Sequence, residues 1–117
     1  EFASLAPIMK KEDGLIDWNL SAVEISRRVR GFQPFPGSFT KYQEKKLTIW
    51  KAFQIESEEL EAESVGKILE ARGDRLVVSC GGKSLLQIDE LQLEGKRRMT
   101  TRDFLNGVKI GIGEQFG

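Results

Sequence analysis

Residues 38–93 form a succession of short segments rich in β-branched, aromatic and aliphatic side chains, and turn residues separate them at short intervals. This spacing is typical of antiparallel strands joined by hairpins and argues against a helical bundle. Five strands are predicted: Ser38–Tyr42, Lys46–Gln54, Val65–Ala71, Arg75–Cys80 and Ser84–Leu93. We therefore expect a mainly β domain, a small antiparallel OB-like barrel of about five or six strands with two short helices.

The connections between these segments predict the details of the sheet. Tight hairpins are expected at Gln43-Glu44-Lys45, at Arg72-Gly73-Asp74 and at the two-residue turn Gly81-Gly82. Gly66 predicts a bulge or a close backbone approach. The acidic connection 56–64 is expected to be a loop or a single helical turn. In the second strand, the buried side is predicted to carry Leu47, Ile49 and Phe53.

Two short helices are predicted outside the strands. Ser21 opens a capping box with Glu24, and apolar residues then recur at helical spacing over Ala22–Arg30. Three arginines fall in the second half of this helix, where cations complement the helix dipole. Gly31 is expected to end it. The second helix is predicted over Thr100–Gly107, with a hydroxyl cap and an acidic first turn.

The segments around the first helix are expected to fasten it to the sheet. Trp18 is predicted to be a packing anchor because of its large apolar area. Residues 33–37 form a rigid Gln-Pro-Phe-Pro-Gly corner. Three phenylalanines are expected to pin that corner to the core: Phe32, Phe35 and Phe39. The glycine-rich tail Val108–Gly117 is expected either to form a short edge strand or to be loose.

The composition excludes several kinds of chemistry. The chain contains no histidine, and its single cysteine is Cys80. The commonest general base and the commonest metal ligand are therefore both absent, so we expect no catalytic residue and no metal site. Cys80 is expected to be a buried apolar residue, and a reducing compartment is expected because no internal disulfide can form. No apolar segment approaches the length of a membrane span.

The charge is balanced overall but unevenly distributed. The 117 residues carry 18 basic and 18 acidic side chains, and seven of the acidic ones lie within residues 54–74. The segments on either side are mildly basic, so a local basic surface can exist. Solvated faces and a groove that binds phosphates both remain open as interpretations. The candidate basic residues are Arg27, Arg28, Arg30, Lys41, Lys45, Lys46, Lys96, Arg97, Arg98 and Arg102.

Four motifs resemble one known family in their order and spacing. They are Ile16-Asp17-Trp18, V-R-G-F-Q-P-F-P-G at 29–37, L-Q-L-E-G-K-R-R-M at 91–99 and D-F-L-N-G at 103–107. Together they resemble the C-terminal domain of methionyl-tRNA formyltransferases. The resemblance implies an interdomain linker over residues 1–15 and a barrel domain over residues 16–117.

The resemblance also implies a function. Enzymes of this family transfer a formyl group from 10-formyltetrahydrofolate to the methionine of initiator tRNA in the cytoplasm. Their chemistry lies in an N-terminal, Rossmann-like domain that this chain does not contain, so no cofactor is expected here. The C-terminal barrel contributes a basic face to tRNA binding. Carried onto this sequence, the RNA-binding residues are Lys96, Arg97, Arg98 and Arg30.

A second interpretation stays open. Other formyltransferases, acting on amino sugars or with folate, carry similar C-terminal domains. The neutral net charge fits a domain that braces its catalytic partner and has no RNA role. The basic residues at 96–98 favour the tRNA partner, because a small sugar nucleotide presents far fewer phosphates than an RNA chain.

Overall fold

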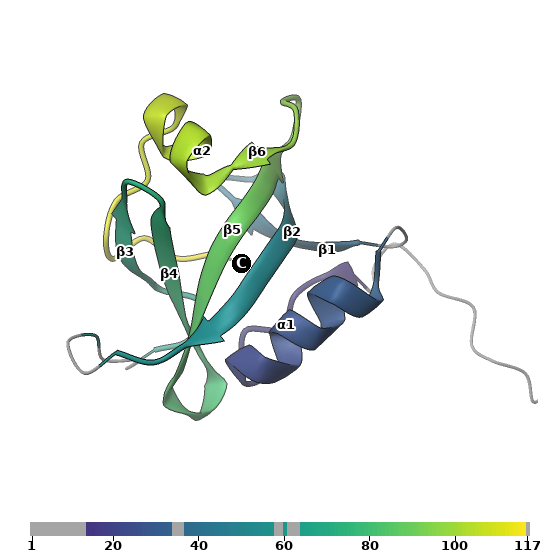
Figure 1. The fold of residues 1–117 in the computed structure, drawn as a ribbon, viewed down its shortest axis with the longest axis vertical. Helices are drawn as coiled ribbons and strands as arrows, with labels where there is room; N and C mark the ends of the chain where they lie inside the picture. The colour runs from purple at the N-terminus through teal and green to yellow at the C-terminus, as the bar shows by residue number, and fades with distance from the viewer. Residues whose placement is uncertain (1–13, 34–36, 58–59, 61–63, 117) are drawn as a thin grey trace, which may run out of the picture.

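The computed structural model describes residues 14–33, 37–57, 60 and 64–116 of the chain. Figure 1 shows a curved sheet with one helix packed beneath it and a second helix at its other end. The elements in chain order are α1 (Ala22–Gly31), β1 (Ser38–Tyr42), β2 (Lys45–Ile55), β3 (Ile68–Arg72), β4 (Arg75–Cys80), β5 (Ser84–Leu93), β6 (Met99–Thr100) and α2 (Thr101–Gly107), with a 3-10 turn, η2 (Gly81–Lys83), before β5.

The six strands form one antiparallel sheet in the order β1-β2-β5-β4-β3, with β6 paired to β5. This confirms the mainly β fold with two helices. The sheet is not closed, because β1 and β3 do not pair with each other, so it is a barrel only in a loose sense. Leu15 bridges the free edge of β1 at Phe39, and Gln115 bridges Lys67 beside β3. Segments from both ends of the described chain thus cover the two edges.

A bulge in β2 decides which of its side chains are buried. Leu47 and Ile49 are fully buried, as predicted. The pairing of β2 with β5 then shifts register between Ile49 and Ala52. Such a shift reverses the faces of all later residues. Ala52 is therefore buried and Phe53 is 45% exposed, so the predicted burial of Phe53 is wrong.

Helix α1 forms where its capping residues predict it. The Ser21 hydroxyl accepts a hydrogen bond from the Glu24 amide at 3.3 Å, which satisfies one free donor of the first turn. Ala22, Ile25 and Val29 are buried, and this stripe packs against β2. Gly31 is the last helical residue and does not take a left-handed conformation; the cap is Phe32, with φ of −89°. The helix therefore extends one residue beyond its predicted end.

The C-terminal tail is part of the core. Phe116 stacks on Trp18 with ring centroids 5.8 Å apart, and the Trp18 indole N–H donates to the Thr40 hydroxyl at 3.0 Å. Trp18 is thus the anchor that the sequence predicts. Gly66 has a φ of +74°, and a Cβ there would lie 3.1 Å from the Phe116 carbonyl oxygen. The predicted close backbone approach at Gly66 is confirmed.

Several boundaries differ from the predicted ones. Strand β3 begins at Ile68, because the backbone at Val65 and Gly66 turns before the strand starts. The β4–β5 connection has three residues, Gly81–Lys83, one more than predicted. Strand β6 was not expected. Phe32 and Phe39 are half-buried and outside the buried core cluster, and Phe35 lies outside the described residues.

Candidate nucleic-acid interface

The three predicted basic residues at 96–98 lie on the connection between β5 and β6, which we call the basic loop (Gly95–Arg98). The Lys96 amide donates to the Leu93 carbonyl at 2.8 Å, and the Gln92 side-chain amide donates to the Lys96 carbonyl at 2.9 Å. These bonds fix the backbone of the turn. All four residues of the loop are exposed. The loop therefore presents its cations to solvent from a defined scaffold.

The cations of the basic loop differ in their partners. Nε and Nη2 of Arg98 each lie 2.8 Å from Oε1 of Glu90. Within the part of the chain that the structure describes, Lys96 and Arg97 pair with no carboxylate. Two of the three predicted phosphate ligands are therefore available, whereas Arg98 is held by a neighbouring strand.

Arg98 belongs to a cluster on the outer face of β2 and β5, which we call the Trp50 cluster (Trp50, Lys51, Glu90, Gln92 and Arg98). The Arg98 guanidinium carbon lies 4.8 Å from the centroid of the Trp50 ring. The Trp50 indole N–H donates to Gln92 Oε1 at 3.0 Å. Lys51 Nζ lies 3.0 Å from Glu90 Oε2. The hydrogen bond from Lys51 and then the charge of Arg98 hold the pKa of Glu90 below its ordinary value.

Sequence reasoning missed Trp50. The signal was available, because alternation along β2 buries Leu47 and Ile49 and so places Thr48 and Trp50 on the opposite face. Trp50 is half-buried on the polar face of the strand and is followed by a lysine. The packing of the core does not require a tryptophan at this position. The register of β2 against β5 shifts next to this residue.

The β1–β2 hairpin lies directly beside the basic loop. The Lys46 amide donates to Glu94 Oε1 at 2.9 Å, and the Glu94 amide donates to the Lys46 carbonyl at 2.8 Å. The Lys46 ammonium lies over the Phe39 ring, 4.8 Å from its centroid. Lys41 is the register partner of Lys46. Two groups of candidate cations that are far apart in sequence are thus neighbours in the fold.

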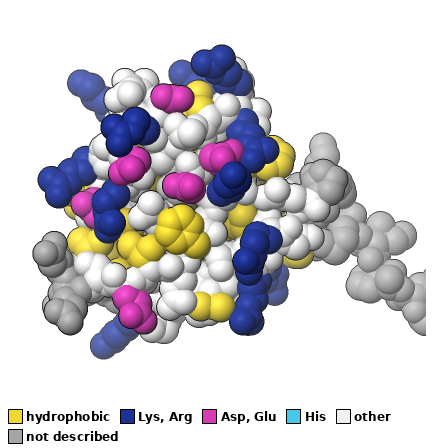
Figure 2. Space-filling view, in the orientation of Figure 1, with side chains coloured by type: hydrophobic (Ala, Val, Ile, Leu, Met, Phe, Trp, Pro, Cys, Tyr) yellow, Lys and Arg dark blue, Asp and Glu magenta, His cyan; other side chains and the backbone are white. Residues whose placement is uncertain are grey.

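Arg30 lies at the other side of β2. It is exposed in the last turn of α1. That end of the helix is tied to β2 by Gln33, whose side-chain amide donates to the carbonyl of Val29 at 2.9 Å and to that of Trp50 at 2.6 Å. Among the described residues, Arg30 forms no ion pair. Figure 2 shows Lys and Arg side chains over the β5–β6 loop and, lower on the right, over α1.

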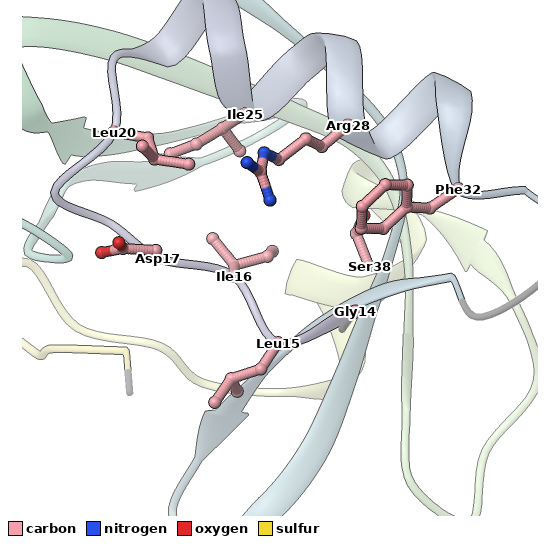
Figure 3. Close-up of a pocket in the computed structure, with 9 residues that line it drawn as sticks. All are labelled: Gly14, Leu15, Ile16, Asp17, Leu20, Ile25, Arg28, Phe32 and Ser38. Carbon is pink, nitrogen blue, oxygen red and sulfur yellow. The ribbon is translucent and has the colours of Figure 1, made fainter. Parts of the chain in front are cut away.

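Arg28 does not join this surface. Its guanidinium reaches from α1 toward Ile16, beside the Phe32 ring, in the pocket drawn in Figure 3. The distance to the ring centroid is 5.9 Å. The pocket has a volume of about 10 Å³, which is roughly the space that one water needs. It is too small for a folate or any other organic substrate.

The α2 side of the basic loop carries charges of both signs. A hollow between β6 and α2 is lined by Glu90 and Asp103 together with Arg97 and Arg98. The adjoining hollow adds Asp74 and Asp89. Arg102, another candidate cation, lies 3.6 Å from Asp74. The carboxylates on this side offset the cations, whereas the side toward β2 carries the exposed hairpin lysines.

The described residues offer no catalytic set. Cys80 is buried, and burial raises the pKa of its thiol to about 12. Among the residues described, no group of three or more Asp, Glu or Cys side chains could hold a metal ion, and no helix is long and apolar enough to cross a membrane. The exposed cations of the basic loop and the β1–β2 hairpin are suited chemically to binding an anionic polymer.

Comparison with known proteins agrees with the family resemblance. A family model described as formyl transferase, C-terminal domain, matches residues 8–109. Methionyl-tRNA formyltransferase of Koribacter versatilis is 42% identical over 97% of this chain. The enzyme of the same name from Acidobacterium capsulatum is 45% identical over 98% of it. The alignments cover 35% and 36% of those two relatives, so this chain spans about a third of their length.

Solved structures share the fold. A variant of HypX from Aquifex aeolicus superimposes with a TM-score of 0.63 at 20% identity, over 91% of this chain and 19% of that chain. HypX from the same organism in complex with tetrahydrofolic acid gives a TM-score of 0.62 at 19% identity, over 93% of this chain and 22% of that chain. At this level of identity the likeness concerns the fold alone.

Proposed function

The chain belongs to the family of formyl transferase C-terminal domains, and from this premise we propose that it is the tRNA-binding C-terminal domain of a methionyl-tRNA formyltransferase. In this proposal an N-terminal formyltransferase domain in cis uses 10-formyltetrahydrofolate, and this chain positions initiator Met-tRNA for it. The proposed function also implies that the protein is located in the cytoplasm. The pocket between α1 and residues 14–17 has room for about one water, and the proposal assigns the donor to the other domain.

One observation carries the proposal: Lys96 and Arg97 are exposed on a loop whose backbone is fixed, and neither pairs with a carboxylate of the described residues. A tRNA backbone is a dense row of phosphates, and each cation that neutralises a phosphate releases counterions. The hairpin lysines beside the loop extend the positive surface, and Arg30, exposed in the last turn of α1, adds a further cation. The bracing domain of an amino-sugar or other folate-dependent formyltransferase is not favoured, because the relatives are methionyl-tRNA formyltransferases.

The experiment is a titration of this chain with tRNA at several salt concentrations. Each phosphate contact contributes roughly 0.7–0.9 to the slope of log affinity against log salt. The double variant Lys96→Gln and Arg97→Gln should weaken binding and lower the slope by about 1–2. If affinity and slope stay unchanged, the assignment of the basic loop is wrong.

A matched control removes two charges elsewhere. Lys83 and Lys109 are exposed and lie outside the basic loop, the hairpin and α1. The double variant Lys83→Gln and Lys109→Gln changes the net charge by the same amount. It should leave the slope close to that of the unchanged chain, because these positions hold no proposed phosphate contact.

A further inference from the structure

Trp50 lies at the centre of the proposed interface, and the phosphate contacts do not use it. We propose that Trp50 and Arg98 form a stacking platform for one unpaired nucleobase, beside phosphates held by Lys96 and Arg97. The inference rests on the proposed function and deepens it, since it specifies a single-stranded or looped-out nucleotide as the ligand. A fully paired helix cannot offer the face of a base to this platform.

The Trp50 ring is held rigidly at the surface. Its indole N–H donates to Gln92, and its backbone carbonyl accepts from the side chain of Gln33 on the α1 side. A side chain that is already fixed loses little conformational freedom when a ligand binds. Aromatic rings of this kind stack on any base, because every base has a π-face.

Arg98 completes the platform. Its guanidinium lies over the Trp50 ring and is fastened from the side by Glu90, which Lys51 holds in turn. A phosphate would have to displace the Glu90 carboxylate to bind Arg98, so this residue is a poorer phosphate ligand than its two neighbours. Its side chain is still 45% exposed. A planar cation with an open face is a surface on which unpaired bases stack.

Charge and polarity around the platform favour a nucleotide as the occupant. On the basic loop next to it, Lys96 and Arg97 pair with no carboxylate among the described residues. The hollow toward α2 combines Arg97 and Arg98 with Glu90 and Asp103, so its charges balance. A docking protein would be expected at exposed apolar side chains. The large hydrophobic residues exposed among those described are Leu15, Phe53 and Ile112, and none belongs to the Trp50 cluster.

The two tryptophans of the chain make a direct test possible. Trp18 is buried and Trp50 is half-buried, so stacking of a base should quench the emission of Trp50 alone. The chain is titrated with a short single-stranded RNA and with a perfectly paired duplex RNA. We expect saturable quenching with the single strand and none with the duplex. If both RNAs bind but neither changes the emission, the platform is overturned.

Conservative variants separate stacking from charge. Trp50→Leu keeps apolar volume without a π-face, whereas Trp50→Phe keeps an aromatic face. Trp50→Leu should weaken single-strand binding by roughly 5- to 100-fold and Trp50→Phe by much less. Arg98→Lys keeps the charge but not the plane, and it should weaken single-strand binding while leaving duplex binding intact. The salt slope should stay unchanged in all three, since no phosphate contact is removed.

The outcomes distinguish this inference from the proposed function. If tRNA does not bind in a salt-dependent way, the proposed function fails. If tRNA binds with the expected slope but Trp50→Leu and Arg98→Lys equal the unchanged chain, only the platform fails. If the N-terminal domain of a relative quenches Trp50 and RNA does not, the surface is an interdomain contact and the platform is likewise overturned.

Discussion

Trp18 and Trp50 are the same residue type in opposite settings. Each donates its indole N–H to a neighbouring side chain, Thr40 in one case and Gln92 in the other, at 3.0 Å. The Trp18 ring stacks on Phe116 and is 6% exposed. The Trp50 ring lies on the outer face of the sheet and carries Arg98. The group that packs on each indole thus differs: the aromatic ring of Phe116 in the core for Trp18, and the guanidinium of Arg98 at the surface for Trp50.

The largest expected effect concerns stability at Trp18. Trp18→Ala leaves a large cavity between Phe116 and Gly66, so it should lower the free energy of unfolding by about 3–5 kcal/mol. Urea unfolding measures this. Trp50→Ala is the control and should cost much less, because its ring is not in the core. Equal losses at the two positions would contradict the comparison.

A somewhat smaller loss is expected at the tail. Phe116 is 4% exposed and contacts both Trp18 and Tyr42. Phe116→Ala should cost about 2–4 kcal/mol, at the lower end for an aromatic truncation because the chain end can relax. Ile112→Ala in the same tail should stay within about 0.5 kcal/mol, since Ile112 is 72% exposed. Thermal unfolding of the two variants would show whether the tail is a structural element.

The backbone contact behind Trp18 predicts a third difference. Gly66→Ala should destabilise by about 2 kcal/mol, because the left-handed conformation alone costs roughly 1–2 kcal/mol and the new Cβ would crowd Phe116. Gly73→Ala has a similar φ of +61° but open space around it, so it should cost about 1 kcal/mol. A smaller loss at Gly66 than at Gly73 would show that the close approach is not a constraint.

The smallest effect concerns Glu90 in the Trp50 cluster. Its pKa is lowered in the folded chain, so its stabilising contribution is present above its unfolded pKa and is lost as the pH falls through the lower folded value. Glu90→Gln should therefore destabilise at pH 7 by less than about 1 kcal/mol, because the ion pairs are partly exposed. The difference from the unchanged chain should vanish once the pH lies below the folded pKa of Glu90. A difference that grows in acid would reverse the sign assigned here.

The sequence predicts most of the strands because their ends carry local signals. The bounds of β1, β4 and β5 agree with the predicted ones, since turn residues follow or precede each of them. Phe53 was misplaced because a bulge is a tertiary adjustment between β2 and β5 that alternation cannot reveal. Strand β6 has two residues, too few to leave a periodic pattern.

The candidate interface is predicted in position but not in detail. The motif at 91–99 places three cations on one loop, and the structure has them there. The motif alone does not show that Arg98 pairs with Glu90, because Glu90 becomes its neighbour only after the chain reverses between β5 and β6. The adjacency of Lys46 and Glu94 also depends on pairing between β2 and β5. Whether these residues bind RNA stays a prediction.

Segments from both ends of the described chain cover the edges of the sheet, and this arrangement affects the order in which contacts form during folding. Trp18 and Phe116 meet across almost the whole length of the described chain, and contacts between such distant residues form late because a long loop must close first. The β2–β5–β4 pairings can form while the tail is still being synthesised. Trp18 then stays without its stacking partner until Phe116 has left the ribosome, and during that interval a chaperone or a protease would find it exposed.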